Sequence, residues 1–196
     1  MRLFLDSADG REIRTCLEQG SIEGVYLPAG AAASLAEVCD LVRGPVIVEA
    51  AGQAAEGLLR SAQALARTAP NVVVRVPLTA DGLKVIRVCA EEKIATCAAL
   101  CSSPAQALLA GKAGATYVSP AVGRDEETAA DGVDLVRRIV AIYKTYGFTT
   151  QTLVTAVRNP NHIVDAALVG AQAAVVPFAV LQALVKQPLT DAGLGT

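Results

Sequence analysis

Charged side chains stand at the ends of apolar segments in this sequence, and they are the first candidates for chemistry. Asp6 and Glu49 each follow an apolar run, and Arg75 interrupts the run Val72–Val76. Neither carboxylate can stay ionised in an apolar setting without a partner, and Arg75 is the obvious partner. Two interpretations stay open: a buried ion pair that only joins strands, or a group that handles a substrate directly.

The chemistry of Arg75 narrows these possibilities. A guanidinium stays protonated at any useful pH, so it can bind a carboxylate or phosphate but cannot act as a nucleophile. An amine at this position could form a Schiff base with a ketone, whereas a guanidinium cannot. Arg75 therefore predicts anion binding rather than covalent catalysis.

Two more arginines, Arg124 and Arg158, follow the sixth and seventh predicted strands. Asn159 and Pro160 then open a helix, whose free backbone N–H groups and dipole favour an anion. We expect a phosphate or carboxylate clamp here, with ordinary surface arginines paired to acidic residues as the alternative. His162, in the first turn of that helix, is interpreted as a capping or packing residue rather than a general base.

Short apolar runs rich in β-branched residues alternate with helical stretches along the whole chain. The predicted strands are Leu3–Leu5, Gly24–Leu27, Val46–Val48, Val72–Val76, Ala95–Ala99, Thr116–Val118, Thr152–Val157 and Ala173–Val176. The helical stretches include Ala54–Thr68, Ala80–Glu92, Pro104–Ala113, Asp131–Tyr146 and Pro160–Val169. Strands that are apolar on both faces and alternate with helices belong to a parallel sheet.

Eight such units could form either a doubly wound open sheet or a closed barrel. No G-x-G-x-x-G turn follows the first strand, which counts against a dinucleotide-binding open sheet. Polar residues recur at the carboxyl ends of many strands, and in a barrel these ends meet at one mouth. They are Asp6, Tyr26, Glu49, Arg75, Arg124 and Arg158. We therefore predict an α/β fold with a single (β/α)8 TIM barrel domain over residues 1–196.

Composition excludes several classes of protein. The net charge of -2 and the absence of a basic run argue against a nucleic-acid partner. The apolar runs are too short to span a membrane, and a strand-like segment beginning at Arg2 leaves no room for a signal peptide, so we expect a cytoplasmic protein.

The five cysteines form no CxxC and the single histidine offers no partner, so we expect no metal site and reduced thiols. Only Cys97 and Cys101 have a spacing that keeps a site role open.

Four longer strings carry a family resemblance. They are Leu5-Asp6-Ser7-Ala8, residues 71–79 (NVVVRVPLT), residues 113–120 (AGATYVSP) followed by Val122-Gly123-Arg124, and residues 188–194 (PLTDAGL). They resemble the small transaldolases and fructose-6-phosphate aldolases over essentially the whole chain. The resemblance implies a (β/α)8 barrel whose active members cleave or transfer a dihydroxyacetone unit through a lysine Schiff base, without a metal or organic cofactor. By the same resemblance, Asp6 matches an aspartate that assists proton transfer, and Arg124 and Arg158 match residues that hold the substrate phosphate.

The sequence departs from the family pattern at the implied catalytic centre. Arg75 stands at the lysine position, and residues 26–30 (YLPAG) replace a T-T-N-P-S segment. Non-matching side chains also occupy four other pocket positions, namely Cys97, Ala99, Ala121 and Ala156. The five lysines fall on predicted helices or at their ends: Lys84, Lys93, Lys112, Lys144 and Lys186. We therefore predict that Schiff-base aldolase and transaldolase activity is absent or negligible.

Several functions are compatible with this pattern. The first is a pseudoenzyme of carbohydrate metabolism that binds a phosphorylated or carboxylated small molecule. The second is an enzyme with altered chemistry, in which Asp6 or Glu49 is an acid or base and Arg75 steadies a developing anion. The third is a scaffold without a ligand. The fourth is an active aldolase whose catalytic positions were altered deliberately, or a relaxed paralogue of one.

The resemblance also implies a homo-oligomer. Family members form pentamers or decamers in which a C-terminal helix reaches a neighbour. Because this sequence ends at Gly195-Thr196, near where that helix would start, we expect a smaller or looser assembly.

Overall fold

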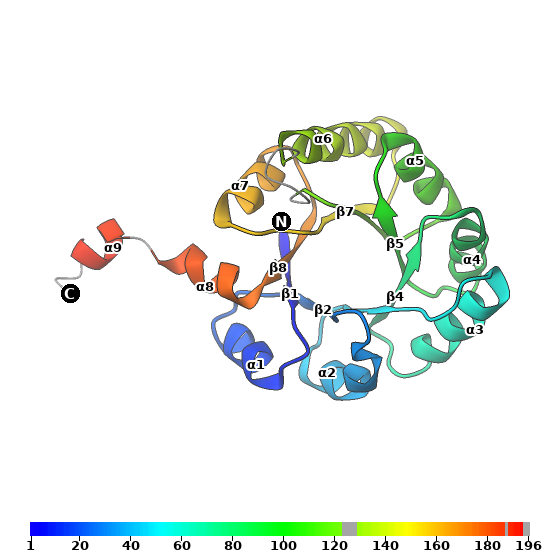
Figure 1. Ribbon diagram of the computed structural model, residues 1–196, viewed down its shortest axis with the longest axis horizontal. Helices are drawn as coiled ribbons and strands as arrows, with labels where there is room; N and C mark the ends of the chain where they lie inside the picture. Colours follow the sequence, from blue (N-terminus) through cyan, green and yellow to red (C-terminus); the bar gives the residue numbers. More distant parts are fainter. Residues whose placement is uncertain (123–128, 187, 194–196) are drawn as a thin grey trace.

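Eight parallel strands close into one barrel, in the order β1 to β8 around the ring (Figure 1). The computed structural model describes residues 1–122, 129–186 and 188–193. The strands are β1 (Arg2–Asp6), β2 (Gly24–Tyr26), β3 (Val46–Glu49), β4 (Val72–Pro77), β5 (Thr96–Cys101), β6 (Tyr117–Pro120), β7 (Gln151–Val154) and β8 (Ala173–Pro177). The predicted (β/α)8 barrel is confirmed.

Helices cover the outside of the barrel (Figure 1). They are α1 (Gly10–Glu18), η1 (Ala31–Ser34), α2 (Leu35–Leu41), α3 (Ala55–Ala66), α4 (Ala80–Glu91), α5 (Pro104–Ala113), α6 (Ala129–Tyr146), α7 (Pro160–Leu168), α8 (Phe178–Val185) and α9 (Pro188–Gly193). The five helical stretches named from the sequence agree with α3 to α7 to within two residues at each end. The last helix, α9, lies apart from the ring (Figure 1). Within the described ranges, no helix is both long enough and apolar enough to cross a membrane.

The predicted seventh strand, Thr152–Val157, was wrong at its carboxyl end. Strand β7 ends at Val154, and Thr155 makes only an isolated bridge with Ala121. Ala156 then takes a positive φ of 59°, which takes the backbone out of the extended conformation that a strand requires. The apolar run therefore continues past the point where regular pairing stops.

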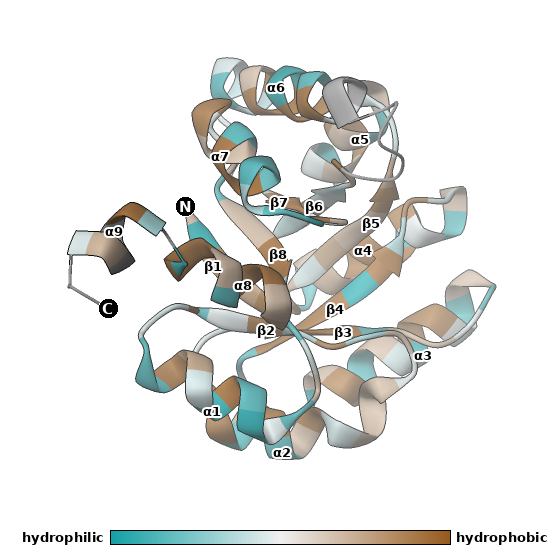
Figure 2. Ribbon diagram, turned by 60° about the vertical axis from the view of Figure 1, so that its left-hand side comes forward, coloured by the Kyte–Doolittle hydropathy of each residue, from teal (hydrophilic) through white to brown (hydrophobic). Residues whose placement is uncertain are grey.

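Alternating side chains give the barrel an inner and an outer apolar cluster. The inner cluster consists of Phe4, Ile47, Val73, Cys97, Tyr117, Leu153, Ala173 and Val175. The outer cluster packs the other strand face, including Val72, Val74 and Val76 of β4, against the helices. Figure 2 shows the result, with mostly apolar strands inside helices of mixed polarity. Because successive residues of a strand face opposite sides, Arg75 shares the inner face with Val73 and lies closer to the carboxyl end.

A second arginine closes the amino-terminal end of the barrel. The Arg2 guanidinium donates a hydrogen bond of 2.8 Å to the Tyr117 hydroxyl and another to Gln151. It also lies 5.8 Å from the centre of the Phe4 ring and 5.5 Å from that of Tyr117. These contacts fill the amino-terminal end of the interior.

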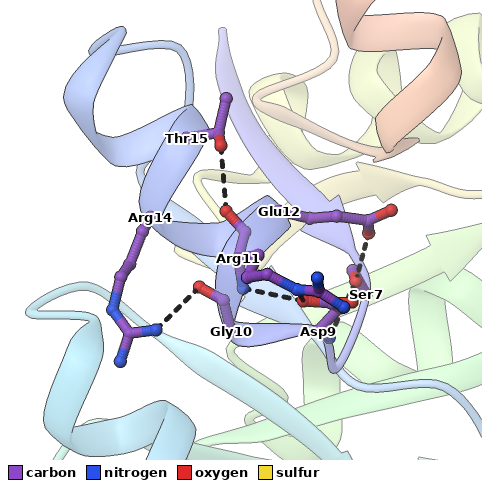
Figure 3. Close-up of polar contacts among 7 residues, drawn as sticks. All are labelled: Ser7, Asp9, Gly10, Arg11, Glu12, Arg14 and Thr15. Atoms are coloured by element: carbon purple, nitrogen blue, oxygen red, sulfur yellow. Dashed lines mark hydrogen bonds and ion pairs between the residues drawn. The ribbon is translucent and has the colours of Figure 1, made fainter.

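Polar contacts fix the chain immediately after β1 (Figure 3). The Asp9 side chain accepts a hydrogen bond of 2.7 Å from the Arg11 backbone N–H and so caps α1. The Ser7 hydroxyl accepts from the Asp9 backbone N–H at 3.0 Å and donates to the Glu12 carboxylate at 2.5 Å. The loop that follows Asp6 is therefore tied to the first turn of α1.

Close packing between β4 and α4 also positions the end of β4. The backbone N–H of Gly82, the third residue of α4, donates to the Thr79 hydroxyl at 3.0 Å. A Cβ atom at Gly82 would lie 1.8 Å from the Pro77 carbonyl oxygen, so only glycine allows the helix to approach the strand this closely.

We expect Gly82→Ala to lower the free energy of unfolding by roughly 1–3 kcal/mol, because the strand and helix must separate to admit the methyl group. Gly57→Ala is the matched control, since Gly57 is the third residue of α3 and its added Cβ would meet nothing nearer than 3.8 Å. In that control, the free energy of unfolding is expected to rise by up to about 1 kcal/mol, because alanine has a higher helix propensity than glycine. Urea unfolding of both variants measures the difference, and equal stabilities would contradict this packing argument.

Candidate functional site

A cavity of about 330 Å³ opens at the carboxyl ends of the strands. Its lining residues come from the strands and the loops that follow them: Tyr26, Ala29, Glu49, Arg75, Pro77, Ala99, Leu100, Cys101, Ser119, Ala121, Thr155 and Ala156. A volume of this size lies at the lower end of the range for small-molecule sites, about 300–1,000 Å³. Its position at the carboxyl end of a (β/α)8 barrel is where such barrels hold their sites.

Arg75 is the central charged group of this cavity. Its Nη2 atom lies 2.6 Å from Oε2 of Glu49, which faces it directly in the register of β3 and β4. Its Nη1 atom donates to the Tyr26 hydroxyl, and the guanidinium carbon lies 4.7 Å from the centre of the Tyr26 ring. The predicted pairing of Glu49 with Arg75 is therefore present.

Burial and neighbouring charges act on Arg75 in opposite directions. Burial lowers the pKa of Arg75, but Tyr26 and Glu49 more than offset this effect, so the pKa is raised overall. The Arg75 side chain is only 12% exposed, whereas that of Glu49 is 48% exposed. Burial also raises the pKa of Tyr26 to about 12. Arg75 is therefore cationic and the Tyr26 hydroxyl is neutral at physiological pH.

Asp6 ends β1 at the same mouth but is not among the residues that line the cavity. Its side chain is exposed, yet partial withdrawal of the carboxyl from water raises its pKa, and the positive charge of Arg75 partly counters this effect. The two groups thus influence each other electrostatically.

The other predicted pocket residues fall at two depths. Ala99, Ala121 and Ala156 line the cavity, together with Tyr26. Cys97 is fully buried in the inner cluster, and burial raises its pKa to about 12. Cys97 therefore lies outside the cavity lining, as a protonated thiol.

The predicted anion clamp is only partly within the described structure. Arg124 lies outside the described residues, and Arg158 follows β7 but does not line the cavity. The Asn159 side chain caps α7 by accepting from the His162 backbone N–H at 3.1 Å. Nδ1 of His162 in turn accepts from the Arg158 backbone N–H at 3.4 Å. The imidazole of His162 thus contacts the chain just before α7, while Asn159 provides the cap, and the choice of a capping or packing role over a general base stays a prediction.

Sequence reasoning missed several residues of the lining. Ser119 and Thr155 follow the inward-facing Tyr117 and Leu153 by two positions, so strand periodicity could have placed them. Leu100 gave no such signal, because its place at the rim depends on a shift in the register of β5 and β6 between Ala98 and Cys101.

No lysine lines the cavity. All five lysines of the chain are exposed: Lys84, Lys112 and Lys144 on helices α4, α5 and α6, and Lys93 and Lys186 just after α4 and α8. Across the described ranges, no cluster of three or more His, Cys, Asp or Glu side chains could hold a metal ion. Among the described residues, the ionisable groups that line this cavity are Arg75, Glu49, Tyr26 and Cys101. Burial raises the pKa of the Cys101 thiol to about 11.

A family model described as "Transaldolase/Fructose-6-phosphate aldolase" matches residues 29–194. The chain belongs to the transaldolase/fructose-6-phosphate aldolase family. A protein of Sorangium cellulosum named "Probable transaldolase" is 45% identical over 99% of this chain and 94% of its own length. A protein of the same name from Caulobacter vibrioides is 47% identical over 99% of this chain and 93% of its own length.

Among solved structures, inosine 5' monophosphate dehydrogenase from Legionella pneumophila shares the fold with a TM-score of 0.66. It is 12% identical, over 92% of this chain and 59% of that chain, so the likeness concerns the barrel alone. In this member of the transaldolase/fructose-6-phosphate aldolase family, the inward position on β4 thus carries a guanidinium held by a carboxylate and a phenol.

We expect Arg75→Gln to raise the pKa of Asp6 further above its usual value near 3.9, because the charge that lowers this pKa is removed. The matched control is Arg87→Gln on α4, where the arginine side chain is 69% exposed and paired with Glu91, and it should leave Asp6 unchanged. Carbon-13 NMR titration of the Asp6 carboxyl provides the measurement. An unchanged or lower pKa in Arg75→Gln would contradict the electrostatic coupling.

Proposed function

We propose that this family member binds a small carboxylated or phosphorylated molecule at Arg75 and forms no Schiff base with it. The observation that supports this most strongly is the guanidinium inside the cavity, directly opposite Glu49 in the sheet. A guanidinium offers several N–H donors in a planar fork that suits oxyanions, but it does not condense with a ketone.

The positions of the lysines support the same proposal. Schiff-base catalysis needs an amine within reach of the substrate carbonyl. All five lysines are exposed on the helical layer or just after a helix, and none lines the cavity. We therefore attribute to this barrel a role in carbohydrate metabolism, which is the area that its relatives' name indicates. In this role the protein would recognise its ligand without forming a covalent bond to it.

A second candidate is an enzyme that uses acid–base chemistry without an imine. The raised pKa of Asp6 favours this alternative, because perturbed carboxyl groups near a cavity are typical of proton-transfer sites. In that case Arg75 would stabilise a developing oxyanion, and Asp6 or Glu49 would carry the proton. In either proposal, Arg124 and Arg158 would be further contacts for the anionic group. We also propose that the protein is a cytoplasmic homo-oligomer.

Borohydride trapping tests the absence of Schiff-base chemistry. We expect no covalent adduct when the wild-type protein is treated with fructose 6-phosphate and borohydride, as measured by intact-protein mass spectrometry. Arg75→Lys places an amine in the cavity and is expected to gain an adduct. Arg87→Lys adds a lysine at an exposed position of α4 and should gain none. A wild-type adduct would refute this part of the proposal.

Thermal unfolding tests the anion site. Inorganic phosphate or pyruvate should raise the midpoint of unfolding of the wild-type protein, because a ligand that binds only the folded state stabilises it by mass action. Arg75→Gln should lose this increase, whereas Arg87→Gln should keep it. An equal increase in all three proteins would place the anion somewhere other than Arg75.

A further inference from the structure

Within the described residues, the cavity has one charged wall and one largely apolar wall. Tyr26, Glu49 and Arg75 lie together on the neighbouring strands β2, β3 and β4. Among the described residues, the remaining lining carries no charge and consists of Ala29, Pro77, Ala99, Leu100, Ala121 and Ala156 together with Cys101, Ser119 and Thr155. A ligand that fills this space must present an anionic group to the first wall and something else to the second.

On the far side of the cavity, the two side-chain hydroxyl groups both donate to backbone carbonyls. The Ser119 hydroxyl is buried and donates a hydrogen bond to the Ala98 carbonyl oxygen at 3.5 Å. The Thr155 hydroxyl donates to the Pro120 carbonyl at 3.1 Å. These hydroxyl oxygens could still accept from a ligand hydroxyl, but they offer no free donor. A ligand with several hydroxyl groups would therefore lose more hydrogen bonds to water than these two groups replace, which disfavours its binding.

Leu100 is the most unusual residue of the apolar wall. Its side chain is 64% exposed, and its backbone has a φ of 61°, which a bulky residue rarely adopts. The other exposed large apolar side chains within the described ranges lie on helices or at the amino terminus, whereas Leu100 lies on a strand at the cavity rim. The register shift between Ala98 and Cys101 accounts for this backbone conformation, but burial does not account for a leucine at this position. Backbone outliers of this kind are often found at functional sites.

The charged wall favours a single negative charge on the ligand. Glu49 already shows how a carboxylate meets the guanidinium, at 2.6 Å. Asp6 and Glu49 both lie at the mouth, so a doubly charged phosphate would meet more repulsion than a carboxylate.

We propose that the cavity takes a short-chain carboxylate without hydroxyl groups, with its carboxylate at Arg75 and its carbon chain against Leu100 and the alanine wall. This inference rests on the proposed anion site and names the chemical class of its ligand. Leu100 is then the residue that determines specificity, because its exposed side chain covers the carbon chain at the rim.

Equilibrium dialysis of the full chain with radiolabelled acetate, butanoate, hexanoate and gluconate, at constant ionic strength, tests this proposal. We expect the dissociation constant to fall roughly three- to fourfold for each methylene group that leaves water. Hexanoate and gluconate have equally long carbon chains, and gluconate differs mainly by its hydroxyl groups. Hexanoate should bind roughly tenfold more tightly or better.

Leu100→Gly should fold, because glycine adopts a positive φ readily, and should flatten the dependence on chain length. Lys93→Gly is the matched control, since Lys93 also has a φ of 61° but lies after α4, away from the cavity, and it should bind all four acids like the wild type. A gluconate affinity equal to or above that of hexanoate, or a chain-length dependence that survives Leu100→Gly, would overturn the proposal.

The same titrations separate this proposal from the anion site on which it rests. If the acids bind and Arg75→Gln abolishes binding, but chain length has no effect, only the ligand class is wrong. If no acid binds the wild type, or Arg75→Gln binds equally well, both proposals fail.

Discussion

The ion pair between Arg75 and Glu49 joins two neighbouring strands at the mouth of the barrel, and the character of the cavity depends on it. The two residues face each other in the register of β3 and β4, and both point inward because they share the inner face with Val73 and Ile47. Removing Glu49 would leave the largely buried guanidinium of Arg75 without its carboxylate partner, which is costly. The pair therefore holds a permanent cation at the place where a ligand would enter, with Tyr26 supporting it from β2.

The rest of the barrel determines how much room remains beside this cation. The inner apolar cluster fills the middle of the ring, and Arg2 with its contacts to Tyr117 and Gln151 fills the amino-terminal end. Within the described interior of the barrel, the carboxyl ends of the strands are left to form an open cavity. Glycine at position 82 lets α4 approach Pro77, and the capping contacts around Ser7 fix the chain after Asp6. The helical layer thus positions the strand ends from outside, while the inner cluster limits the depth of the site.

The fold could be predicted from the sequence because each strand and each helix has a strong local pattern, and eight alternating units leave few arrangements. The pairing of Glu49 with Arg75 followed from the cost of leaving either charge alone in an apolar run. Other features depend on the register between strands, which local patterns do not contain. The end of β7 and the exposed position of Leu100 both arise where regular pairing breaks off, and the depth of Cys97 depends on how far its strand is shifted relative to its neighbours. The roles of the predicted site residues stay predictions.

A crystal structure of the protein soaked with butanoate would test the central claim most directly. We predict a carboxylate within about 3.2 Å of the Arg75 guanidinium nitrogens, with the carbon chain toward Leu100 and no covalent link to any side chain. This prediction would be contradicted by butanoate bound away from Arg75, or by a lysine side chain reaching into the ring of strands.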